Sequence, residues 1–127
     1  MGRYLITADY TDGTGVTVSN STVPQVIKTW TLDQSDAYNI IVTAVFRVTG
    51  AGSGTAQAIN PTITIGSNVR TFAFNSKVAA DDDYITVVYA AESRAGDVVT
   101  AQLNGSAAND ANTTVNVKSF IIEQISP

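Results

Sequence analysis

The most constraining feature of this sequence is its content of β-branched residues, because 43 of the 127 residues are Val, Ile or Thr. These side chains are stiff about χ1 and pack well on a pleated surface. The good helix formers Leu, Met, Glu, Lys, Arg and Gln together supply only 18 residues. We therefore expect an all-β chain. Its length suits one domain with a real core, so we expect a single domain over residues 1–127.

Composition also excludes several kinds of chemistry. The chain has no His and no Cys, which excludes Ser-His-Asp and Cys-His catalysis and metal sites built on imidazole or thiolate. A net charge of −4 with only seven Lys and Arg argues against a nucleic-acid partner. No stretch approaches 18 apolar residues, so we expect no membrane partner. We expect a protein that is not an enzyme and that uses no cofactor and no metal.

Alternating apolar and polar runs, separated by turn residues, recur along the chain as in a sandwich or barrel. Residues 50–61 form a long run of small residues that we expect to be a loop, and residues 75–83 form a connection with room for one helical turn. About nine strands are expected, at residues 3–8, 16–19, 26–32, 38–49, 62–65, 69–74, 84–91, 97–104 and 114–125.

Two strands carry more apolar surface than one core needs. In residues 38–49 the even positions are apolar and the odd ones polar, except for Ile41 and Val45. Residues 84–91, which include Tyr84 and Val88, are apolar on both faces, as in a central strand or an interface strand. A neighbouring subunit would cover such residues, and a loop folded over them is an equal alternative. Ile41, Val45, Tyr84 and Val88 are therefore our candidate subunit-interface residues.

The last third of the chain carries a family resemblance. The turn Ala95-Gly96-Asp97 leads into Val98-Val99, and residues 119–125 form an apolar terminal strand. This arrangement resembles the end of tumour-necrosis-factor-like and complement-type jelly rolls, and Tyr38 to Ala44 looks like their Tyr-rich early strand. The resemblance covers about half of the chain. It implies a single antiparallel jelly-roll sandwich of about eight to nine strands.

Small, Cys-free jelly rolls of this kind occur in bacteriophage virions, usually as trimers, and this sets the functional expectation. We expect a capsid decoration (cement) protein on the virion surface, a homotrimer that binds the major capsid protein or another virion protein. Residues 1–10 are available as an extended N-terminal arm. The alternative is a receptor- or carbohydrate-binding knob of a tail fibre or spike, and a third reading is a cellular complement-like or adhesin module. The sequence carries no coiled-coil or collagen-like stalk, which favours decoration over a knob.

Other candidate sites have plainer explanations. Asp81-Asp82-Asp83 offers oxygen ligands for a hard cation, but a solvated loop is the favoured interpretation, with an acidic contact for a partner as a further alternative. Turn chemistry explains the residues at 9–15 and at 109–112 without a metal. Trp30, with the five tyrosines, could supply a platform for stacking against a sugar. Its place in the middle of a strand favours packing in the core or at a subunit interface. No spacing marks a pair of carboxylates for glycoside hydrolysis.

Overall fold

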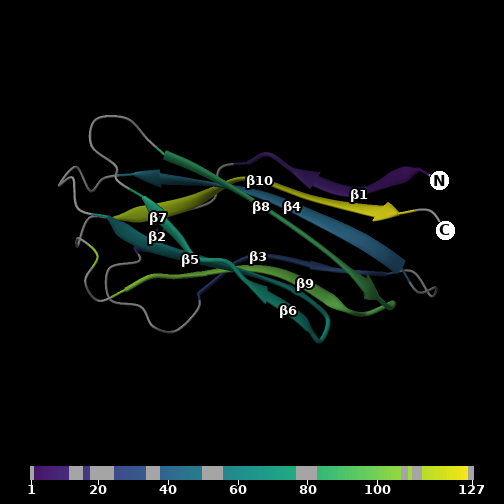
Figure 1. The fold of residues 1–127 in the computed structure, drawn as a ribbon. Helices are drawn as coiled ribbons and strands as arrows, with labels where there is room; N and C mark the ends of the chain where they lie inside the picture. The colour runs from purple at the N-terminus through teal and green to yellow at the C-terminus, as the bar shows by residue number, and fades with distance from the viewer. Residues whose placement is uncertain are drawn as a thin grey trace.

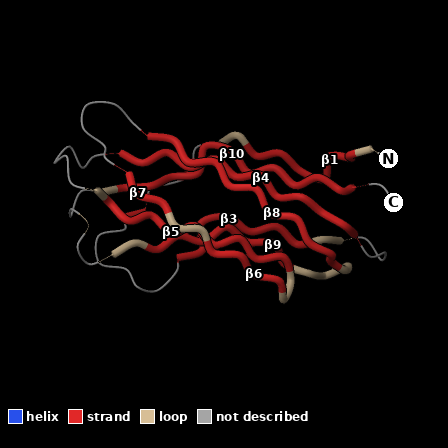
Figure 2. Tube along the Cα trace, viewed as in Figure 1, coloured by secondary structure: helices blue, strands red, loops and turns tan. Residues whose placement is uncertain are grey.

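The computed structural model describes residues 2–11, 16–17, 25–33, 38–49, 56–76, 83–106, 109 and 113–125. They form two antiparallel sheets that pack face to face (Figure 1 and Figure 2). Sheet A contains β1 (Arg3–Asp9), β10 (Thr114–Ile125), β4 (Tyr38–Thr49) and β8 (Asp83–Ser93) in that order, and β2 (Val16–Thr17) also pairs with β10. Sheet B contains β3 (Gln25–Thr31), β9 (Val98–Asn104), β5 (Gln57–Ile65) and β6 (Asn68–Thr71), and β7 (Phe74–Ser76) also pairs with β5. No helix among these residues is long and apolar enough to span a membrane.

The pairing of the strands defines a jelly roll. The first long strand pairs with the last (β1 with β10), β3 pairs with β9, β4 with β8, and β5 with β6. The chain is thus wound like one long hairpin whose successive pairs fall alternately in sheet A and sheet B. The predicted fold class, an all-β antiparallel jelly-roll sandwich, is confirmed.

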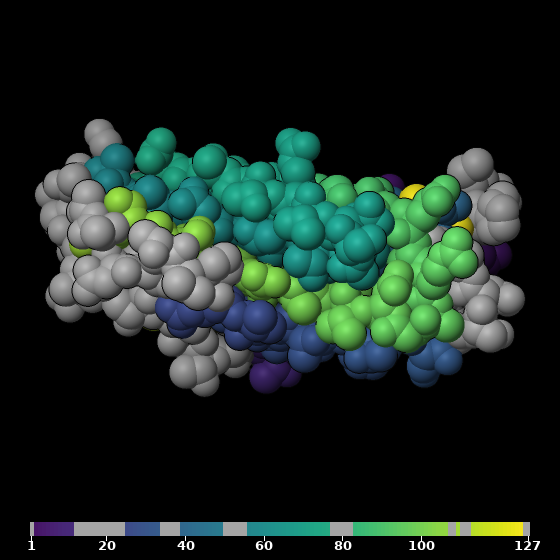
Figure 3. Space-filling model, turned by 90° about the horizontal axis from the view of Figure 1, so that it is seen from below, coloured from purple at the N-terminus to yellow at the C-terminus, as the bar shows by residue number. Residues whose placement is uncertain are grey.

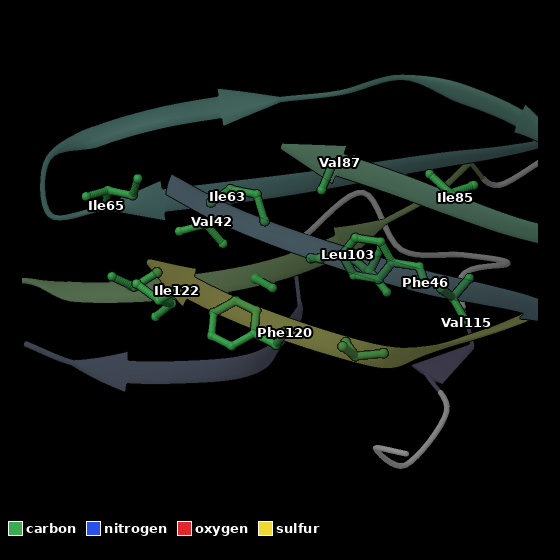
Figure 4. Close-up of a cluster of buried hydrophobic side chains, with 14 of the residues drawn as sticks. Val42, Phe46, Ile63, Ile65, Ile85, Val87, Leu103, Val115, Phe120 and Ile122 are labelled. Carbon is green, nitrogen blue, oxygen red and sulfur yellow. The ribbon is translucent and has the colours of Figure 1, made fainter. Parts of the chain in front are cut away.

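The core lies between the sheets and is built by strict alternation. In β4 the even positions from Ile40 to Val48 are all fully buried, as the sequence predicts. Figure 4 shows their contacts: Val42 and Phe46 of β4 lie among Ile63 of β5, Ile85 of β8 and Phe120 of β10. A pleated strand presents alternate residues to opposite faces, so this pattern fixes the inner face of sheet A.

Strand β10 keeps its apolar residues on the inner face only because of a β-bulge. Val115 and Val117 are odd-numbered, whereas Phe120 and Ile122 are even-numbered, and all four are buried. The register with β4 shifts between Val117 and Ser119, which adds one residue to β10 at that point. The extra residue changes the parity, so both pairs of side chains face the core.

The structure corrects three boundaries in the middle of the chain. Residues 57–61 belong to β5 and are not part of a loop. Pro61 is accommodated where the neighbour of β5 changes from β7 to β6, and its carbonyl accepts a hydrogen bond from Phe72 N at 2.8 Å. The expected strand at 69–74 is split into β6 and β7, and residues 75, 76 and 83 of the expected helical turn lie in strands. The rest of that turn, residues 77–82, lies outside the described residues.

Two further expectations concern the edges of sheet A. Strand β8 is apolar on both faces but lies at the end of the strand order, so its second apolar face does not reflect a central position. Residues 3–9, considered above as part of an arm, pair with β10 as β1. Ile6 of β1 packs against the core.

The depth of the core gives a direct test of this packing. Phe46 is fully buried, and replacing it with Ala removes a ring from the centre of the sandwich. We expect Phe46→Ala to lower the free energy of unfolding by about 3–5 kcal/mol, measured by urea denaturation. Val69→Ala, at an exposed position of β6, is the control and should cost less than about 1 kcal/mol. Equal losses in the two variants would contradict the assigned core.

Candidate ligand-binding groove and apolar face

The four candidate interface residues all lie on the outer face of sheet A. Val88 of β8 pairs with Thr43, which lies between Ile41 and Val45 on the outer face of β4. Tyr84 lies opposite Arg47 on the same face. Tyr84 and Val88 are 57% and 56% exposed, Val45 is half-buried, and Ile41 is buried. The four residues therefore share one surface, although no subunit contact is present in the structure.

That surface carries several apolar side chains with polar ones between them. On the side of β4 away from β8, Ile121 of β10 lies opposite Thr43. In a second cross-strand row, Glu123 of β10 lies between Leu5 of β1 and Ile41 of β4. We call the outer-face residues Leu5, Ile41, Val45, Tyr84, Val88 and Ile121 the apolar face. On the outer face of sheet B the exposed valines alternate with threonines, whose hydroxyls bond to one another across the strands.

A groove lies along the open side of the sandwich, between β1 of sheet A and β3 of sheet B. Its volume is about 320 Å³, and its walls include Thr7, Asp9 and Tyr10 from the first sheet and Lys28 and Trp30 from the second. Figure 3 looks onto the outer face of sheet B, with β3 in blue along its edge and purple atoms of the N-terminal segment beyond that edge. We call this feature the β1–β3 groove.

Trp30 reaches the groove because of a second β-bulge. The register between β3 and β9 shifts between Val26 and Lys28, so Trp30 lies opposite the buried Val99, whereas Val26 lies opposite Gln102 on the outer face. Strict alternation would place Val26 and Trp30 on one face, and the bulge puts them on opposite faces. In the described part of the chain β3 is an edge strand, and Trp30 is 40% exposed and lies outside the core cluster.

An ion pair joins the two sheets across the groove. Lys28 Nζ donates to Asp9 Oδ2 at 2.6 Å, and Thr11 N donates to Asp9 Oδ1 at 2.9 Å. The Lys28 side chain is only 17% exposed, so part of this pair is shielded from water. The hydrogen bond from Lys28, helped by that from Thr11, holds the pKa of Asp9 below its usual value. Sequence reasoning did not single out Lys28, because the residues are 19 positions apart and only the sheet pairing brings them together.

These groups make a binding surface of mixed character. Trp30 and Tyr10, which is 68% exposed, present aromatic faces beside a fixed carboxylate and ammonium. The indole N–H of Trp30 has no hydrogen-bond partner among the described residues and is available as a donor. An aromatic platform with a few well-placed polar groups is typical of a small-molecule site.

The candidate metal ligands do not come together in the described part of the chain. Of the acidic run at 81–83 only Asp83 is described, and it accepts a hydrogen bond from Ser76 Oγ at 2.7 Å. Asn109 is buried and clamps β5 by bonding to both N and O of Ala58 at 2.8 Å. Among the described residues no group of three potential ligands could hold a metal ion.

Comparison with known proteins supports the fold and little else. No family model matches the chain, and no curated protein matches it either. A solved structure described as the EclA C-terminal domain, a sugar-binding protein, superposes with a TM-score of 0.58 at 14% identity. The match covers 94% of this chain and 81% of the other. At this level of identity the likeness establishes a shared β-rich fold.

The ion pair predicts a specific acid sensitivity. A carboxyl group whose pKa is lowered in the folded state stabilises the fold at pH values above the pKa it has in the unfolded chain, about 3.9 for Asp. This contribution is lost as the pH falls through the lowered pKa of the folded state. We expect Asp9→Asn to reduce the melting temperature at pH 7, and the gap from wild type to close as the pH falls through the lowered pKa of Asp9. Asp33→Asn, at an exposed position, is the charge-matched control. A gap for Asp9→Asn that is independent of pH would contradict the assigned pair.

Proposed function

We propose that this chain is a non-enzymatic carbohydrate-binding domain and that the β1–β3 groove is its glycan site. The observation that carries the proposal is the exposed Trp30 beside the Asp9–Lys28 pair. Within the resemblance described above, this function corresponds to the receptor-binding knob of a phage tail fibre or spike.

The chemistry of a sugar ring fits the groove. A pyranose has an apolar C–H face and a rim of hydroxyl groups. The C–H face packs against an aromatic ring such as Trp30, which buries apolar surface at little cost in side-chain freedom. The hydroxyls donate to the Asp9 carboxylate and accept from the Lys28 ammonium and the indole N–H. Because Asp9 and Lys28 neutralise each other, the groove favours a neutral sugar over a charged one.

Two considerations favour binding without catalysis. Glycoside hydrolysis uses two carboxyl groups that flank the scissile bond, and of the described residues lining the groove only Asp9 carries one. That carboxylate is held ionised by Lys28, so it is unsuited to act as a general acid. The sugar-binding description of the structural neighbour supports the same class of function.

The central prediction concerns Trp30. We expect Trp30→Ala to lower the affinity for the best ligand on a glycan array by at least about tenfold, because the stacking surface is lost, whereas Trp30→Phe keeps part of it. Isothermal titration calorimetry measures both, and circular dichroism checks that the fold is intact. Val69→Ala, on the far edge of sheet B, is the control. Undiminished binding by Trp30→Ala would refute the site.

A second function, capsid decoration, is favoured by one separate observation, the apolar face of sheet A. Tyr84, Val88 and Leu5 are exposed there beside the half-buried Val45 and Ile121. Contiguous exposed apolar surface marks interaction sites in soluble proteins. In this reading the face packs around a three-fold axis, and the trimer bridges copies of a capsid protein on the virion surface.

Self-association through this face is tested by a charge. We expect the wild-type protein to sediment as a trimer at about 100 μM, and Val88→Lys to shift it towards monomer because a buried unpaired ammonium is costly. Val98→Lys is the matched control, since Val98 lies on the outer face of sheet B. A monomeric wild-type protein, or equal effects of the two variants, would overturn the trimer.

A further inference from the structure

The free edge of β8 differs from the other edges of the sandwich. Among the described residues β8 is the last strand of sheet A, and in Figure 1 it is the green strand that crosses in front of β4 and β10. It has eleven residues, keeps an unbroken register with β4, and contains no Gly, Pro or basic residue. Residues 84–91 carry no charge at all. A long, regular and uncharged edge is a template for pairing with another strand.

The other described edges carry the features by which native proteins prevent such pairing, namely bulges, charges and short strands. β1 and β3 each contain a β-bulge, and β3 also carries Lys28. β6 has four residues, one of them Arg70, while β7 has three and β2 has two. In the described part of the chain, β8 is therefore the edge that lacks this protection.

Hydrogen bonds at the two ends of β8 show which of its backbone groups face away from β4. Asn68 Nδ2 donates to Glu92 O at 3.1 Å, and Tyr84 N donates to Asp83 Oδ1 at 3.0 Å. In an antiparallel pair each residue directs its N–H and C=O to the same side, and the side alternates along the strand. The even-numbered residues of β8 therefore direct these groups away from β4.

The two side-chain bonds satisfy the ends of this edge and leave its middle open. Thr86, Val88 and Ala90 lie between Tyr84 and Glu92 and have the same parity. Their outward N–H and C=O groups have no hydrogen-bond partner among the described residues. Six backbone groups at the spacing of a β-ladder are thus presented to one side, and the group that matches them is another extended backbone.

The side chains along the edge define the character of the incoming strand. Val88 is 56% exposed on the outer face, and on the inner face Tyr89 and Ala91 pack against the core but are only half-buried. A further strand would place its side chains alternately beside these two sets and cover both. β-branched residues suit such a position.

The charges at the ends of the edge define the ends of the partner. Asp83 and Glu92 flank the uncharged residues 84–91, and the chain as a whole has a net charge of −4. Basic residues at both ends of an incoming strand would lie beside these carboxylates, whereas acidic residues there would be repelled.

We infer that residues 86–90 of β8 form a docking edge for an extended segment of another polypeptide, β-branched in its middle and basic at its ends. The segment joins sheet A as a further strand beside β8. Main-chain hydrogen bonds supply affinity in this mode of recognition, and alternate side chains supply specificity. The docking edge and the β1–β3 groove lie at opposite ends of the strand order of sheet A, so the inference does not depend on glycan binding.

Amide NMR with hydrogen exchange tests the inference on the wild-type protein. The probe is the peptide acetyl-Lys-Val-Thr-Val-Thr-Val-Lys-amide, and the matched peptide has Glu in place of both Lys residues. We expect the Lys peptide to bind saturably below about 1 mM and to slow exchange of the amides of residues 86, 88 and 90 at least about tenfold. The amides of residues 85, 87 and 89, which face β4, should change little. The Glu peptide should bind at least about fivefold more weakly.

Three results would overturn the inference. The first is the absence of saturable binding of the Lys peptide, and the second is equal affinity for the two peptides. The third is slowed exchange at residues 86, 88 and 90 that grows with protein concentration in the absence of peptide, because the occupant would then be a second copy of this chain.

Thr86→Pro tests the role of the backbone directly. The substitution removes one outward N–H and places a ring at the edge, while the bonds to β4 come from the odd-numbered residues, so the fold should tolerate it. We expect native circular dichroism and at least about tenfold weaker binding of the Lys peptide. Thr86→Ala, which keeps the N–H, is the control and should bind as the wild type does. Ala90→Pro has the same design and replaces Thr86→Pro if that variant does not fold. Undiminished binding by a folded proline variant would refute the docking edge.

Discussion

The burial of two apolar sheet faces against each other is the constraint on which the rest of this molecule depends. With no disulfides and no helix among the described residues, the sandwich is stabilised chiefly by removing residues such as Phe46, Ile63 and Phe120 from water. The core strands must therefore each direct one face of apolar residues inward. In β10 the sequence breaks the alternation and a bulge restores it, whereas in β3 a bulge turns Val26 to the outer face. Those bulges decide which side chains the surface presents.

The sequence predicts the strands well where alternation is strict and less well elsewhere. Ile40 to Val48 are recognisable as an inner face because every second residue is apolar, and the β-branched content fixes the fold class. Pro61 read as the end of a loop, because nothing local shows that the neighbouring strand changes at that point. The register shift at Ile27 is equally invisible in the sequence. The mid-strand position of Trp30 favoured packing in the core or at a subunit interface, and the structure places it outside the core cluster. Asp9 and Lys28 meet only through tertiary pairing.

The candidate sites lie where the sandwich cannot close on itself. Its inner faces meet along the middle, but in the described part of the chain β1 and β3 are the edge strands on one side, and inward-facing residues such as Trp30 and Lys28 reach solvent there. The apolar face is a different kind of surface, on the outer side of sheet A.

The most direct test of the central claim, that the β1–β3 groove binds sugar, uses the fluorescence of Trp30, the one tryptophan in the chain. Its emission reports on the groove alone, without a label. Titration with neutral mono- and oligosaccharides should produce a saturable blue shift or change in intensity as the sugar ring covers the indole, and the change should weaken in Asp9→Asn, which loses the carboxylate acceptor. Glycan binding measured independently with no change in Trp30 emission would contradict the account.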